Sequence, residues 1–155
     1  ILNQNAKAVG REVSPGSVKD LVNMFSETGV GIVQMPCPQL EFNGGLHRKP
    51  KTKSAYDTKK YRDYCRKLSK LILQQIEKYL EKKYNVLCVL GIEFSPTCAV
   101  HQLENGSRNV PGKGIFFEEF EEEMRKKNFQ IPIVGINLNN LYNTTERIQS
   151  MLKYS

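Results

Sequence analysis

Val86–Ile92 constrains the fold more than any other segment, because it is a continuous apolar run that contains no charged side chain. Runs of this kind are typical of strands that are buried on both faces, as in a parallel sheet. Two further runs, Gly31–Met35 and Ile131–Ile136, predict short strands. Ile1–Leu2 is interpreted as the tail of a first strand.

Segments with helical spacing separate these strands. Val18–Phe25 has apolar residues three and four positions apart, and Gly29 is expected to end this helix. Phe116–Lys127 carries its acidic residues first and its basic residues last, which suits the helix dipole. Thr144–Leu152 predicts a closing helix.

The longest expected helix begins at a cap on Asp57 or Thr58 and runs to about Lys83. Its apolar residues recur at helical spacing and are expected to share one face that belongs to the core. This stripe consists of Cys65, Leu68, Leu71, Ile72, Ile76, Tyr79 and Leu80.

Strands that are separated by helices imply a parallel sheet with helices on both faces. We therefore expect an α/β fold: a three-layer Rossmann-like domain with a mostly parallel sheet. A chain of 155 residues suffices for one domain with its own core. The expectation is a single domain over residues 1–155.

The cellular setting follows from apolar runs and cysteine content. No run approaches the roughly 18 to 20 apolar residues that span a bilayer, and the first residues do not resemble a signal peptide. Four cysteines are too sparse for a disulfide scaffold and indicate a reduced compartment. We expect a cytoplasmic protein that does not bind membranes, and the oligomeric state stays open.

Positive charge is concentrated in one stretch. The formal net charge is +7, and residues 47–70 contain ten Lys or Arg against only Asp57 and Asp63. Such a stretch can attract an anionic ligand or a nucleic acid. We favour a solvated helix face and linker, and do not expect nucleic acid to be the partner. Part of the stretch lies in Glu41–Ala55, which is rich in glycine and lysine and predicts a long loop.

Two of the four cysteines lie where chemistry is expected. Cys37 and Cys98 each follow an apolar run in a loop that contains proline, and loops after parallel strands meet at one sheet edge. Backbone N–H groups and helix N-termini at such positions can stabilise a thiolate. Cys65 on the helical stripe and Cys88 within a buried strand are interpreted as core residues.

Three chemistries could use the two loop thiols: an iron–sulfur cluster, a zinc site or a thiol–disulfide pair. Zinc is disfavoured because no Cys-x-x-Cys pair is present and the nearby extra donors are His47 and His101. A disulfide requires the Cα atoms of Cys37 and Cys98 to lie roughly 4.4 to 6.8 Å apart. Two unrelated loop thiols are the remaining interpretation.

A resemblance that spans nearly the whole chain favours the cluster. The sequence resembles the thiouracil desulfidase family and its uncharacterised relatives, with the Pro-Cys-Pro and Ser-Pro-x-Cys motifs in the same order. Gln39 and Ala99 depart from that pattern, where an acid and a glycine are typical. The blocks that carry the resemblance are Ile1–Lys7, Gln34–Gln39, Tyr56–Thr58, Gly91–Cys98 and Pro111–Phe116.

The resemblance implies a small Rossmann-like domain that holds a [4Fe-4S] cluster through three cysteines and leaves one iron open. Cys37 and Cys98 would be two of the ligands, with Thr97 beside the cluster. The third cysteine is expected just before Ile1. The open iron would accept sulfur from a thiolated nucleobase or a similar small thioamide, and water would replace sulfur at the ring carbon.

The resemblance also suggests roles for polar residues near these loops. Ser95, Glu93 and Glu41 are the candidates for acid–base work, although Ser95 and Thr97 could equally cap the turn or donate hydrogen bonds to cluster sulfides. Candidates for substrate contact are Asn3, Asn5 and Arg48.

Two other functions stay open at this point. One is a non-catalytic α/β module that binds a nucleotide or another anion through the basic stretch. The other is a thiol redox protein that uses Cys37 and Cys98, although a Cys-x-x-Cys spacing is missing.

Overall fold

The computed structural model describes residues 1–153, without the side chains of Asn143 and Lys153. The chain divides into two units, Ile1–Pro50 and Lys51–Ser155. Each unit is described by itself below. The expectation of a single domain over residues 1–155 stays a prediction.

The first unit contains the short 3-10 helix η1 (Gln4–Ala6) and two helices, α1 (Lys19–Thr28) and α2 (Pro38–Phe42). α1 confirms the helix expected at Val18–Phe25, and Gly29 ends it in the left-handed conformation with a φ of 72°. Glycine adopts this conformation without a steric penalty, which is why it commonly ends helices. The buried side of α1 consists of Leu21, Met24 and Phe25.

The strands expected at Gly31–Met35 and Ile1–Leu2 are wrong, since neither segment forms a strand in the described structure. A strand needs a partner for its backbone hydrogen bonds, and an apolar run does not by itself supply one. Ile32 and Val33 are 43% and 54% exposed, so the run is not buried either. The helix α2, which follows directly, was not expected from the sequence.

The second unit begins with α3 (Lys53–Tyr56), which interrupts the end of the long loop expected over Glu41–Ala55. α4 (Lys59–Glu81) follows, and the side chain of Thr58 caps it by accepting a 3.2 Å hydrogen bond from the Tyr61 N–H. The cap and the helix agree with the sequence-based prediction.

The apolar stripe of α4 is confirmed only in part. Cys65, Leu68, Ile72 and Ile76 are buried, but Leu71 is 63% exposed. Successive residues turn by about 100° around a helix, so Leu71 points well away from the face that these four share. Tyr79 and Leu80, which were also assigned to the core, are exposed in the last turn.

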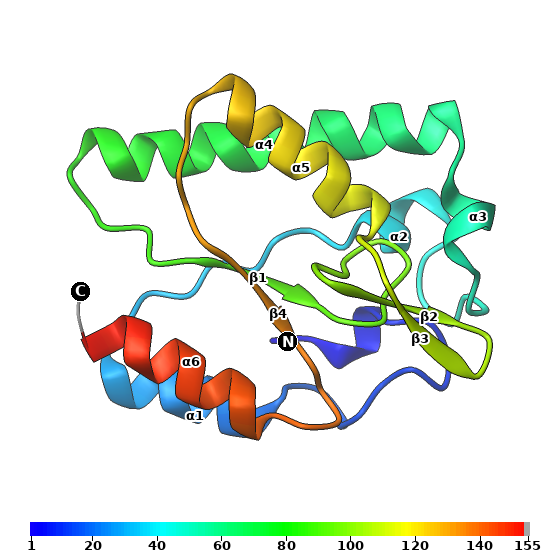
Figure 1. The fold of residues 1–155 in the computed structure, drawn as a ribbon, viewed down its shortest axis with the longest axis horizontal. Helices are drawn as coiled ribbons and strands as arrows, with labels where there is room; N and C mark the ends of the chain where they lie inside the picture. The colour runs from blue at the N-terminus through cyan, green and yellow to red at the C-terminus, as the bar shows by residue number, and fades with distance from the viewer. Residues whose placement is uncertain (154–155) are drawn as a thin grey trace. The chain divides into compact units, whose positions relative to one another are not determined.

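Two parallel strands form the centre of the second unit. β1 (Val89–Ile92) pairs with β4 (Ile133–Ile136) in parallel, with Leu90 opposite Val134. Both are shorter than the runs that predicted them. α4 and α5 (Ile115–Lys126) lie on one side of this pair, and α6 (Tyr142–Lys153) lies on the other (Figure 1). The unit is therefore mixed α/β with a small parallel sheet.

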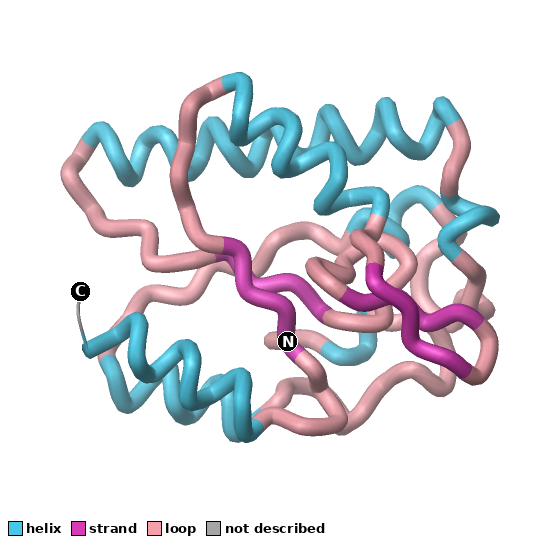
Figure 2. The backbone as a smooth tube through the Cα atoms, in the orientation of Figure 1, coloured by secondary structure: helices cyan, strands magenta, loops and turns pink. Residues whose placement is uncertain are grey.

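An antiparallel hairpin was missed by the sequence analysis. β2 (Gln102–Asn105) pairs with β3 (Arg108–Pro111), as Figure 2 shows beside the parallel pair. Gly106 begins the connecting turn with a φ of 62°. The segment is polar and mostly exposed, so it lacks the apolar alternation by which half-buried strands are recognised. The Asn105-Gly106 pair was the available turn signal.

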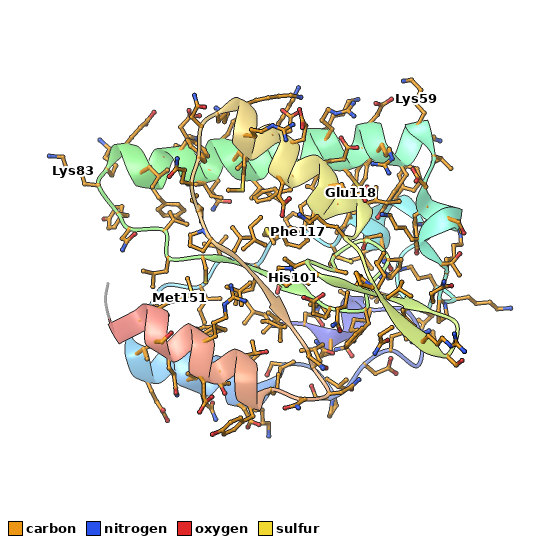
Figure 3. All side chains as sticks on the ribbon, viewed as in Figure 1. Lys59, Lys83, His101, Phe117, Glu118 and Met151 are labelled. Carbon is orange, nitrogen blue, oxygen red and sulfur yellow. The ribbon has the colours of Figure 1, made fainter. Side chains whose placement is uncertain are left out.

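Aromatic side chains of α5 fill the core of the second unit. Phe116, Phe117 and Phe120 are fully buried and lie in mutual ring contact. Figure 3 shows Phe117 on the side of α5 that faces the strands. A Cβ built on Gly91 of β1 would lie 2.7 Å from the Phe117 ring, so the strand and the helix approach closely at a glycine. No helix among the described residues has the length and apolar character needed to cross a membrane.

Candidate functional site

The loop that holds Cys98 is a hydrogen-bonded turn directly after β1. The Ser95 Oγ accepts hydrogen bonds from the backbone N–H of Cys98 at 3.1 Å and of Thr97 at 3.4 Å. The carbonyl of Cys98 in turn accepts a 2.9 Å bond from the N–H of Ile92, at the end of β1. Ser95 therefore caps this turn, as the sequence had allowed, and its acid–base role stays a prediction.

The hydroxyl of Thr97 lies beside the sulfur of Cys98. Thr97 is fully buried, and its Oγ1 is 3.3 Å from the Cys98 Sγ, within hydrogen-bond distance. Cys98 itself is half-buried. A polar group thus contacts this sulfur at a position that is not sealed in the core.

The N-terminus of α5 fastens the same loop. The backbone N–H groups of Ile115 and Phe116 donate to the carbonyls of Pro96 and Thr97 at 3.2 and 3.0 Å. These N–H groups would otherwise lack partners at a helix start. The loop therefore takes up the first donors of α5, and its backbone is held at both ends.

Glu93, a candidate acid or base, braces the backbone that follows the loop. Its carboxylate accepts hydrogen bonds from the N–H groups of Val100, His101 and Gln102, the shortest at 2.9 Å. This geometry gives Glu93 a positioning role for the segment after Cys98, and its acid–base role stays a prediction.

Cys37 lies at the N-cap of α2 in the first unit and is half-buried. Its Sγ is 3.7 Å from the Nη2 of Arg48 and 3.6 Å from the carbonyl oxygen of Ala6. A guanidinium N–H can only donate, so the sulfur accepts from Arg48. The donor to this sulfur belongs to a side chain, and the expectation that backbone N–H groups and a helix N-terminus stabilise a thiolate here stays a prediction.

Arg48 was assigned to substrate contact, but the structure places its donors within the first unit. The residue is only 8% exposed, and it donates to Ala6 O at 2.6 Å, Gly45 O at 3.2 Å and Gln39 Oε1 at 3.3 Å. Its role toward a substrate stays a prediction. The contact of Gln39 with Arg48 was not predicted, because Gln39 was noted only as the residue that stands where an acid is typical of the family.

The remaining candidates in the first unit are near its surface. Asn3 caps η1, because its Oδ1 accepts a 3.0 Å bond from the N–H of Asn5. Asn5 is exposed, and Glu41 is exposed in the first turn of α2. Their contacts with a substrate stay predictions.

The two cysteines that were assigned to the core differ. Cys65 is fully buried on α4, and this burial raises the pKa of its thiol to about 12, while a hydrogen bond with Tyr61 acts in the opposite direction. Cys88 is half-buried and precedes β1, so the expectation of a buried strand position is wrong. Desolvation also raises the pKa of Cys88. The Tyr61 contact with Cys65 was not anticipated, although their spacing of four residues on a helix was the available signal.

An archaeal protein is similar to this chain over most of its length. The uncharacterized protein MJ0003 of Methanocaldococcus jannaschii is 36% identical over 134 residues, which cover 86% of this chain and 79% of that protein. The chain belongs to the family of this archaeal protein. No family model matches the chain, and no solved structure matches it.

Part of the basic stretch of this family member pairs with carboxylates of α5. Arg62 pairs with Glu118 at 2.9 Å and with Glu119 at 3.0 Å, and Arg66 pairs with Glu119 at 2.8 Å. Lys53 also pairs with Glu118. These cations are partnered within the second unit, which favours the structural interpretation of the stretch over an anion-binding surface.

Among the described residues, side chains that can bind metals do not form a cluster of three or more. Within residues 1–153, no set of three or more His, Cys, Asp and Glu residues is close enough to hold a metal ion. His47 and His101 are both exposed.

Proposed function

We propose that this chain is an iron–sulfur-dependent desulfidase that removes sulfur from a thiolated nucleobase or a similar small thioamide. Cys37 and Cys98 are the two ligands of a [4Fe-4S] cluster that the printed sequence offers. The third ligand is the cysteine that the resemblance to thiouracil desulfidases implies before Ile1. The substrate is a small molecule, the protein acts in the cytoplasm, and the finer fold is a three-layer Rossmann-like domain.

The observation that carries the proposal is a polar group beside each loop sulfur. Arg48 Nη2 is 3.7 Å from the Cys37 Sγ, and Thr97 Oγ1 is 3.3 Å from the Cys98 Sγ. Cluster ligands are thiolates, and hydrogen bonds to their sulfurs are a usual part of such sites. Fully buried Cys65, whose pKa is raised, lacks the accessibility of a ligand. The two half-buried loop thiols, Cys37 and Cys98, therefore have the chemistry that a [4Fe-4S] cluster requires of its ligands.

When bound, the cluster supplies an open iron that acts as a Lewis acid and a soft acceptor for the thiocarbonyl sulfur. The chain supplies the polar groups around it. Ser95 Oγ accepts two backbone N–H bonds and lies 3.5 Å from the Thr97 Oγ1, so its hydroxyl keeps this loop and the Thr97 hydroxyl in place beside Cys98. Glu93 keeps the segment after Cys98 in place by accepting three N–H bonds.

Anaerobic reconstitution with iron and sulfide tests the proposal. The protein should be prepared with any residues that its gene encodes before Ile1, and iron, sulfide and visible absorbance should be measured. We expect a brown protein that releases sulfide from a thiolated pyrimidine. Cys37→Ser and Cys98→Ser should lose the cluster, whereas Cys88→Ser, the matched control at a half-buried cysteine, should keep it.

The same experiment separates the other two functions. A colourless wild-type protein that binds no iron would contradict the desulfidase. If Cys37→Ser leaves binding of a nucleotide or another anion intact, the non-catalytic module is favoured. A Cys37–Cys98 disulfide that forms under mild oxidant, detected by mass spectrometry, would favour the redox protein.

A further inference from the structure

We propose that Asn105 is a site of spontaneous covalent modification, at which the side-chain amide is lost and aspartate or isoaspartate is formed. The sequence contains two Asn-Gly pairs, Asn43-Gly44 and Asn105-Gly106. Asparagine deamidates most readily before glycine, because glycine has no side chain to hinder the attack of its backbone nitrogen. In the folded protein the surroundings of the two pairs differ, and they favour the reaction at Asn105. This inference does not depend on the proposed function.

The reaction needs water as its only co-reactant. The backbone nitrogen of Gly106 attacks the Cγ of Asn105, so that a new N–C bond closes a succinimide ring and the bond from Cγ to the amide nitrogen breaks. The proton of the Gly106 N–H leaves with the amide nitrogen as ammonia. Water then opens the ring at either carbonyl, which gives aspartate or isoaspartate. No atom is oxidised or reduced in either step.

Asn105 lies beside the connecting turn of the β2–β3 hairpin (Figure 2), and Asn105, Gly106 and Ser107 are all exposed. Asn105 is the last residue of β2 and pairs with Arg108 across the turn. Both residues of this last pair are exposed, so opening it uncovers no buried side chain and costs little free energy. A Cβ built on Gly106 would have no heavy atom within 4 Å, so the ring has room to form.

Asn43 differs in its side chain rather than in the attacking nitrogen. The N–H of Gly44, like that of the other glycine, donates no hydrogen bond among the described residues. The Asn43 Nδ2, however, is buried, so water does not reach the amide that must leave as ammonia. The backbone is also held, because the N–H of Asn43 donates to Gln39 O at 3.1 Å and the N–H of Gly45 donates to Leu40 O at 2.8 Å. Reaction at Asn43 therefore requires the end of α2 to open first.

Modification at Asn105 changes the charge and the backbone of the hairpin. Either product replaces a neutral amide by a carboxylate, which lowers the formal net charge of +7 by one. Aspartate keeps the main chain and adds a negative charge opposite Arg108. Isoaspartate inserts an extra main-chain carbon and so disrupts the last pair of the hairpin. The acidic product is separable from the original protein by ion exchange.

The test measures deamidation at both asparagines in the full chain. Folded protein, and the same protein unfolded in guanidinium chloride, are incubated in mildly alkaline buffer and digested with pepsin at acid pH, where further deamidation is slow. Mass spectrometry of the two peptides gives a folded-to-unfolded rate ratio for each site. We expect the ratio at Asn105 to exceed that at Asn43 by about tenfold or more, because only Asn43 needs a helix end to open. An equal or smaller ratio at Asn105 overturns the inference.

Two matched variants check the assignment in the intact protein. Asn105→Gln and Asn43→Gln each keep a side-chain amide, but glutamine would have to close a larger ring and reacts far more slowly. Ion exchange should show the acidic form accumulating in Asn43→Gln as in wild type, and several-fold less of it in Asn105→Gln. Unchanged accumulation in Asn105→Gln overturns the inference. If circular dichroism shows that Asn43→Gln has unfolded, the comparison of Asn105→Gln with wild type decides.

Discussion

Gly114 lies against the backbone of Thr97 so closely that a Cβ on Gly114 would be 2.2 Å from the Thr97 carbonyl carbon. The start of α5 and the loop that holds Cys98 are therefore in direct backbone contact. Because the obstacle is backbone rather than a movable side chain, a larger residue at position 114 must displace one of the two segments.

Gly114→Ala is expected to destabilise the protein by about 1–3 kcal/mol, the usual cost of overpacking. Gly112→Ala is the control, since its new Cβ would meet only the flexible end of the Leu103 side chain. Urea unfolding monitored by circular dichroism measures both. Equal midpoints for the two variants would contradict the close contact of α5 with the Cys98 loop.

Glu93→Gln tests the carboxylate that accepts from three backbone N–H groups. The substitution removes a charge and turns one acceptor atom into a donor, so we expect a loss of about 1–3 kcal/mol of unfolding free energy. Glu146→Gln, at an exposed position on α6, should change stability little. If Glu93→Gln is as stable as Glu146→Gln, the bracing role is wrong.

Glu119→Gln tests the ion pairs between α4 and α5. Glu119 is buried and pairs with both Arg62 and Arg66, so its neutralisation removes one charged partner from each of these two cations. We expect a loss of about 1–3 kcal/mol, more than for a surface pair. Glu122→Gln, which affects more exposed pairs on α5, is the control in thermal unfolding. A wild-type melting temperature in Glu119→Gln would refute this assignment.

Cys65 should make stability fall at alkaline pH. Burial raises the pKa of its thiol from 9.0 to about 12. An unfolded thiol ionises first, so the contribution of this group is complete below pH 9 and is lost as the pH rises toward 12. Tyr61, whose pKa burial also raises, titrates in the same direction.

The measurement compares wild type with Cys65→Ala in urea unfolding at several pH values on both sides of the ordinary thiol pKa. The variant should start less stable, because it leaves a small cavity, and should lose less free energy as the pH rises. Burial, the largest cause of the raised pKa of Tyr61, is common to both proteins, so most of the Tyr61 contribution cancels in the comparison. If the unfolding free energies of the two proteins fall in parallel as the pH rises, the prediction that burial raises the pKa of the Cys65 thiol is wrong.

Local chemistry made several features predictable from sequence. Gly29 ends α1 because a left-handed residue there suits glycine, and Thr58 caps α4 because its hydroxyl reaches an N–H three residues later. The parallel direction of β1 and β4 was predicted from apolar runs that are separated by a helix, and the structure adds that these two strands are partners. Cys65 was placed in the core by its spacing with Leu68 and Ile72.

Other features depend on partners that are distant in the sequence. The run Gly31–Met35 has strand character but gains no ladder partner, and Leu71 is apolar but faces away from the core. Arg48 could be named as functional from its loop, yet its approach to Cys37 results from packing around Ala6 and Gly45.

The sequence by itself determined the longer helices, the end of α1 at Gly29, the cap of α4 at Thr58 and the positions of the two loop cysteines. These depend on residues within one or two turns of each other, where backbone preferences and capping hydrogen bonds act. Only the tertiary structure decided which donor faces each sulfur and which charges are neutralised. Those relationships require segments far apart in the chain to be packed together, and the cost of leaving buried charges and N–H groups unpaired selects the arrangement.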